Sequence, residues 1–145
     1  MRALACLLAA SLVGCASPVR EITTDVLDPP RLPDGPPPSR DGGGQLLPVY
    51  LPCGPDAVFR TALVEAGRVG WRVVRQDPAG RAFEAIGTAG WLRLETRAVV
   101  RVRPEGAFNA RVDVRTAAEG LGPWLGTPGQ QAEAYLTRVR GGSCP

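Results

Sequence analysis

The stretch WLRLETRAVVRVRP, residues 91–104, decides the fold because apolar and charged residues alternate along it. Val100 and Val102 fall on one side of this pattern, and Arg101 and Arg103 fall on the other. Successive side chains of a strand point to opposite faces of its sheet, so a period of two predicts a strand with one buried face.

Neighbouring segments extend this strand into a sheet. ARVDVRT, residues 110–116, follows a PEGAFN loop and again alternates valine with charged residues. WRVVRQ (71–76) and RAFEAIGTAGW (81–91) are two further strand candidates, and the turn DPAG (77–80) joins them. Four strands without crossover helices predict an antiparallel sheet, and such a sheet commonly leaves one face wet.

Helical patterns flank these strands on both sides. CGPDAVFRTALVEAG (53–67) has apolar residues three and four apart, with Pro55 in the first turn and Gly67 as a stop signal. GTPGQQAEAYLTRVRGG (126–142) shows the same spacing. Residues 49–145 are therefore expected to form one two-layer α+β domain, with a four-stranded antiparallel sheet and two helices on one face, in the order α-β-β-β-β-α.

Composition limits the chemistry of the chain. Of its 145 residues, 17 are cationic, all of them arginine, 14 are acidic, and none is histidine, so the net charge is only +3. Without histidine there can be no Ser-His or Cys-His pair and no imidazole metal ligand. No glycine-rich phosphate loop is visible either. We therefore expect no enzyme, no catalytic or metal site, no cofactor and no nucleic-acid partner, with a carboxylate-only hydrolase as a remote alternative.

The N-terminus is typical of an exported protein. Arg2 precedes an apolar run that is shorter than the roughly 20 residues needed to span a bilayer. The run ends in LVGC (12–15), which resembles the bacterial lipobox. The resemblance implies that residues 1–14 are removed as a signal peptide and that Cys15 is lipidated, since two or three acyl chains anchor a protein firmly. A chance cysteine in an ordinary secretory signal is the alternative.

The residue after Cys15 gives a further expectation about location. In enteric bacteria an aspartate at this position retains lipoproteins in the inner membrane, and this chain has Ala16 instead. We therefore expect a protein of the bacterial cell envelope, anchored by lipid and facing the periplasm, at the outer membrane in preference to the inner.

Residues 15–48 are dominated by proline and glycine, with proline at 29, 30, 33 and 36–38 and glycine at 42–44. Such a segment buries too little apolar surface to offset the entropy of ordering it. After the lipidated cysteine it is expected to form a disordered tether. A proline-rich ligand for a partner domain is the alternative.

Two cysteines, Cys53 and Cys144, bracket the predicted domain. In an oxidising compartment such a pair favours a structural disulfide. A catalytic or metal-binding thiol is the alternative, and it would need partners that a chain without histidine does not offer.

Three segments, GWRVVRQDPAGRAFEA, WLRLETRAVVRVRP and ARVDVRTAAEGLGPWLGTPGQQAEAYL, resemble a bacterial family known as domain of unknown function 1499, over about residues 50–141. The family includes lipoproteins. Its polar motif positions match Arg101 and Arg115, whereas Thr96 and Arg97 stand where the family has paired acidic residues. The resemblance implies no particular biochemical activity.

The predicted wet face of the sheet offers a candidate binding site. Its candidate residues are Arg101, Arg115, Arg103 and Arg111. Guanidinium groups bind phosphate and carboxylate groups through paired hydrogen bonds, so this face could bind an anionic lipid or glycolipid headgroup. A solvated face with cross-strand charge pairs is the alternative.

Trp124, in GLGPWLGTPG, is the last candidate residue. Its ring could cover the core, or it could anchor a contact with a protein. The expected function is that of a membrane-anchored envelope lipoprotein whose domain is a noncatalytic binding or accessory module for a protein partner. Headgroup binding through the arginine face is the alternative.

Overall fold

The structure is a computed structural model that describes residues 20–25, 28, 30–31, 46–89, 93–118 and 128–142. An α+β fold with an antiparallel sheet and two helices packed on it is confirmed. The elements, in chain order, are β1 (Arg20–Thr23), β2 (Val49–Leu51), α1 (Pro55–Arg68), β3 (Arg72–Asp77), β4 (Ala82–Ala89), β5 (Leu94–Pro104), β6 (Ala110–Ala118) and α2 (Pro128–Gly141).

The four predicted strands, β3 to β6, form an antiparallel meander. The sheet is larger than predicted because two short strands add to the outer edge of β6. Strand β2 pairs with residues 110–112, and β1 pairs with residues 115–118. Strands β2 to β6 thus make a five-stranded sheet, and β1 extends it to six. A strand of three or four residues is too short to show a clear period in the sequence.

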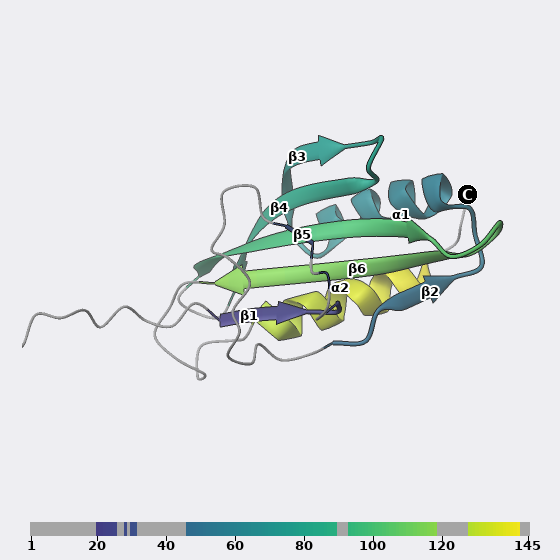
Figure 1. Ribbon diagram of the computed structural model, residues 1–145. Helices are drawn as coiled ribbons and strands as arrows, with labels where there is room; N and C mark the ends of the chain where they lie inside the picture. Colours follow the sequence, from purple (N-terminus) through teal and green to yellow (C-terminus); the bar gives the residue numbers. More distant parts are fainter. Residues whose placement is uncertain are drawn as a thin grey trace, which may run out of the picture.

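Both helices pack against one side of the sheet, as Figure 1 shows behind the strands. The valines that the alternation assigned to the buried face, among them Val100, Val112 and Val114, are fully buried in this core. The Tyr135 hydroxyl of α2 donates a hydrogen bond to the carbonyl of Ala62 in α1, at 3.1 Å. Burial of these apolar side chains is the main contribution to the stability of the domain.

Helix α1 continues past its predicted stop. Gly67 lies inside the helix, and Arg68 is its last residue. The chain turns at Gly70, whose φ of +81° lies in the left-handed region that favours glycine. The turn leads into Trp71, whose ring stacks on Tyr135 with 4.7 Å between ring centroids.

The segment between β1 and Arg31 corrects the prediction of a disordered tether over residues 15–48. Strand β1 is paired in the sheet, and its described continuation crosses the side of the sheet opposite the helices (Figure 1). We call residues 23–25, 28, 30 and 31 the strap. The strap has few apolar residues, and its polar groups hold it against β5 and β6 through hydrogen bonds and ion pairs.

No helix in the described part of the chain is long and apolar enough to cross a membrane.

Candidate functional site

The structure brings the four candidate arginines together on the outer face of β5 and β6, opposite the helices. Arg101 and Arg103 belong to β5, and Arg111 and Arg115 belong to β6. The register of the two strands sets Arg101 against Asp113 and Arg103 against Arg111. Four guanidinium groups thus share one surface, which we call the arginine face.

The strap lies over this face, where it buries Arg115 and leaves the other three arginines 20–30% exposed, so the expectation of a fully wet face is wrong. Asp25 of the strap lies 2.9 Å from Arg103, 3.6 Å from Arg111 and 3.8 Å from Arg101. Asp28 lies 2.9 Å from Arg103 and 3.5 Å from Arg101. The strap therefore provides carboxylates at the place where an external anion would have to bind.

Asp113 is the centre of this ionic cluster, and its side chain is 0% exposed. Its Oδ1 accepts a hydrogen bond from Nε of Arg111 at 2.8 Å, and its Oδ2 lies 3.3 Å from Nε of Arg103. The hydroxyl of Thr24 in the strap lies 3.3 Å from Oδ1 as well. A buried carboxylate with two arginine partners holds both strands and the strap in one arrangement.

Thr24 also joins the strap to the backbone of β6. Its amide donates to the carbonyl of Val114, and its hydroxyl accepts a hydrogen bond from the amide of Val114, both at 2.9 Å. These bonds continue the pairing of β1 by one more residue, through a side chain.

Arg115 is the most deeply buried of the four arginines, at 1% exposure. Its Nη1 donates a hydrogen bond to the carbonyl of Pro30 at 3.2 Å, and Pro30 is itself fully buried. A headgroup could not reach Arg115 while the strap is in place. The structure therefore gives the arginine face a structural role, with partners from the same chain.

The strap does not stand out in the sequence because many proline and glycine residues surround it. One signal was available in the strands themselves. Asp113 lies in the middle of a strand between two valines, and a carboxylate at such a position needs cationic or hydroxyl partners when it is covered. The position of Asp113 therefore indicates that some segment covers the arginine face, but it does not show which segment.

The titration of Asp113 provides a first prediction. Burial raises the pKa of its carboxyl above the ordinary 3.8, and the charges of Arg111 and Arg103 offset the rise only in part. The Asp113 carboxyl then binds a proton more tightly in the native state than in the unfolded chain. Its contribution to the free energy of unfolding is therefore full below about pH 4 and is lost as pH rises through the raised pKa. Carboxyl-carbon NMR should give a midpoint for Asp113 above 3.8. A midpoint at or below 3.8 would mean that the arginines outweigh burial.

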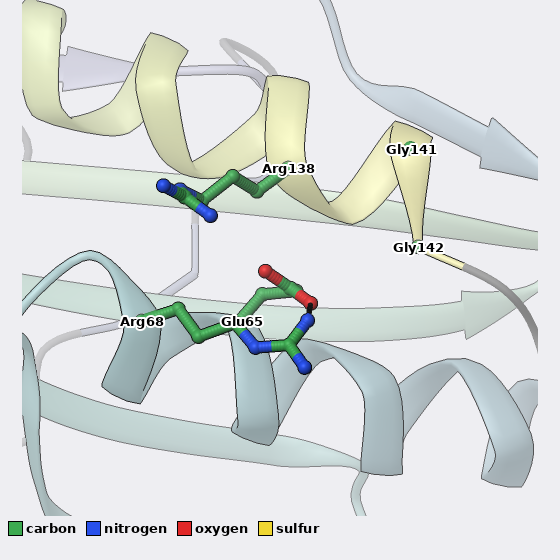
Figure 2. Close-up of a pocket in the computed structure, with 5 residues that line it drawn as sticks. All are labelled: Glu65, Arg68, Arg138, Gly141 and Gly142. Atoms are coloured by element: carbon green, nitrogen blue, oxygen red, sulfur yellow. Dashed lines mark hydrogen bonds and ion pairs between the residues drawn. The ribbon is translucent and has the colours of Figure 1, made fainter.

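A second candidate site is a shallow depression of about 370 Å³ between the C-terminal parts of the two helices. Figure 2 shows Arg68 folded against Glu65 on α1, with Arg138 reaching in from α2. The Glu65 carboxylate is buried and lies 2.5 Å from Nη1 of Arg68. Because this carboxylate already neutralises one of the two arginines, the depression offers little net charge to an anion.

Burial, and secondly the charge of Glu65, raises the pKa of the nearby Tyr135 hydroxyl well above its ordinary value. This hydroxyl therefore stays protonated and keeps its hydrogen bond to Ala62. Contacts between and within the two helices account for the side chains around this depression.

The two edges of the sheet differ in the length of their strands. On one side the sheet ends in the short strands β1 and β2, and on the other side it ends in β3, which is longer; no strand in the described ranges pairs with the outer edge of β3. Most β3 side chains are exposed, and Val74 among them is 41% exposed. An open edge of this kind presents backbone donors and acceptors to other chains.

Several predicted residues lie outside the described residues. These are Cys15, Trp124 and Cys144. Cys53 is described and is disulfide-bonded. In the ranges that the structure describes, no group of three or more acidic or cysteine side chains could hold a metal ion.

Comparison of the chain with known protein families and with curated proteins finds no match. The resemblance to domain of unknown function 1499 therefore stays a prediction.

Proposed function

We propose that this chain is a lipid-anchored protein of the bacterial cell envelope, at the outer membrane and facing the periplasm, whose domain binds a protein partner without catalysis. The LVGC motif, with Cys15 as the lipidated residue, supports the anchor. The open edge of the sheet at β3 is the observation that carries the binding role. The resemblance to a family that includes lipoproteins agrees with this proposal.

The edge favours a partner that contributes an extended segment. Such a segment adds to a sheet through main-chain hydrogen bonds, and the side chains of the edge strand give the pairing its specificity. On β3 these side chains include Arg72, Val74 and Arg75, which would contact an apolar or acidic segment. Strand β3 has six residues, and its register against β4 shifts between Val73 and Arg75, so the segment from Arg75 to Asp77 is its longest regular part.

The anchor is tested by replacing Cys15. In cells that express the full chain, Cys15→Ser is expected to abolish incorporation of a labelled fatty acid and to move the protein from the membrane fraction to the soluble periplasmic fraction, if the signal is still cleaved. The reason is that two or three acyl chains are needed for stable membrane anchoring. Equal labelling of the wild type and Cys15→Ser would disprove this anchor.

The binding edge is tested by a matched pair of substitutions. Val74 on β3 and Val64 on α1 are both exposed valines, at 41% and 55%. Val74→Lys is expected to weaken partner binding about tenfold or more, because pairing at the edge would bury the new charge, whereas Val64→Lys should leave binding unchanged.

Binding can be measured in cells with a photocrosslinking amino acid at Gln76 of β3 and, as a comparison, at Arg60 of α1. Specific adducts are expected from Gln76 alone, and Val74→Lys should remove them. Adducts from Arg60 only, or adducts from Gln76 that are insensitive to Val74→Lys, would contradict binding at this edge.

A further inference from the structure

The position of β1 changes how the anchor relates to the domain. Only residues 16–19 separate Cys15 from Arg20, the first residue of β1. A fully extended chain covers at most about 3.6 Å per residue, so the Cα atoms of Cys15 and Arg20 can be no more than about 18 Å apart. The tether predicted from composition, over residues 15–48, would have allowed about 120 Å by the same rule.

The pairing of β1 identifies the end of the sheet that lies near the anchor. Arg20 is paired with Ala118 of β6, and Ala118 is paired with Thr96 of β5. Thr96 in turn is paired with Gly87 of β4. The anchor therefore joins the domain where β4 and β6 end and where β5 begins.

The opposite end of the sheet lies far from this point. Strand β5 runs for eleven residues to Pro104, and the turn to β6 follows at Gly106. At about 3.3 Å per residue, Arg93 and Glu105 lie roughly 35–40 Å apart along the sheet. The two ends can therefore be distinguished by any probe that senses the bilayer surface.

We propose that the anchor holds the near end of the sheet against the phospholipid headgroups of the membrane. We call this the anchor-proximal end, and its exposed or half-exposed described residues are Thr88, Arg93, Glu95 and Arg97. Among the side chains described at this end, Arg93 and Arg97 are two cations against the one carboxylate of Glu95, and guanidinium groups bind phosphate oxygens. The open edge of β3 then runs along the side of the docked domain, where a partner can reach it.

This proposal rests on the lipid anchor of the proposed function. Its test uses the full, lipidated protein in phospholipid vesicles whose headgroups carry a nitroxide quencher. A fluorescent amino acid is placed at Thr88 in one protein and at Glu105 in another, since both side chains are exposed and neither is one of the two cations. Quenching is expected to be at least threefold stronger at position 88 than at position 105.

A matched control lengthens the connection. Insertion of about 20 Gly and Ser residues between Cys15 and Arg20 gives a flexible chain that no longer holds the domain at the surface. The insertion should lower quenching at position 88 to the level at position 105. Because the inserted residues precede β1, they leave the sheet unchanged, which circular dichroism can verify.

Two results would overturn the proposal, and mass spectrometry of the N-terminal peptide distinguishes them. If Cys15 carries no lipid, the anchor and the docking both fail. If Cys15 carries lipid but positions 88 and 105 are quenched equally, or the insertion does not change quenching at position 88, the docking fails and the anchor stands.

Discussion

A chain that begins at Leu46 is expected to have a free energy of unfolding at least about 3 kcal/mol below that of a chain that begins at Arg20. The shorter chain lacks β1 and the strap. Thr24 makes two 2.9 Å hydrogen bonds to Val114, and each such bond contributes about 1 kcal/mol. Loss of the strap also removes the carbonyl of Pro30, which accepts a hydrogen bond from the buried Arg115. The truncation also removes Asp25, which lies within 4 Å of three arginines, so the guanidinium groups repel one another with fewer carboxylates between them.

The same truncation should expose the arginine face. We expect the chain from Leu46 to bind vesicles of anionic phospholipid and to release them as salt concentration rises, because binding would depend on uncovered guanidinium groups. The chain from Arg20 should bind them weakly. Urea unfolding measures the first effect, and co-sedimentation with vesicles across a salt series measures the second.

Two substitutions in the chain from Arg20 serve as a matched control. The Asp25 side chain is 10% exposed and contacts three arginines, whereas the Asp28 side chain is 65% exposed. Asp25→Ala should lower the free energy of unfolding by about 1–3 kcal/mol, and Asp28→Ala by less than about 1 kcal/mol. If the chains that begin at Leu46 and at Arg20 had the same free energy of unfolding, the strap would not stabilise the domain.

The two helices and the strands β3 to β6 could be predicted because each shows a short-range repeat of apolar residues in the sequence. The alternation in residues 91–104 and 110–116 gave β5 and β6 with their buried valines on the helix side, and spacings of three and four gave α1 and α2. These patterns act within a few residues, so a single sequence contains them.

The cover of the arginine face could not be predicted in the same way. Its contacts join residues far apart in the chain, such as Thr24 with Asp113 and Pro30 with Arg115. The strap is held on the sheet mainly by hydrogen bonds and ion pairs. It therefore lacks the regular spacing of apolar residues from which a helix or strand is predicted. Composition alone therefore favoured disorder there, and the arginines were interpreted as a free surface.

A second large effect is expected at Gly87 of β4, where Gly87→Ala should lower the free energy of unfolding by about 1–3 kcal/mol. A Cβ at this position would lie 2.5 Å from Cδ1 and 2.9 Å from Nε1 of Trp71. The Trp71 ring cannot move aside easily because it is buried and stacked on Tyr135. Relief of the clash would therefore displace the ring from the core between β4 and α2.

Gly67 offers the control, because it lies inside α1 and a Cβ there would meet no atom within 4 Å. Gly67→Ala should raise the free energy of unfolding by about 0.5–1 kcal/mol, since alanine loses less backbone entropy in a helix than glycine. Urea unfolding gives both values, and near-ultraviolet circular dichroism should report a changed tryptophan environment for Gly87→Ala alone. If Gly87→Ala were as stable as the wild type, the contact between this strand and Trp71 could not be tight. The glycine would then have no packing reason to be there.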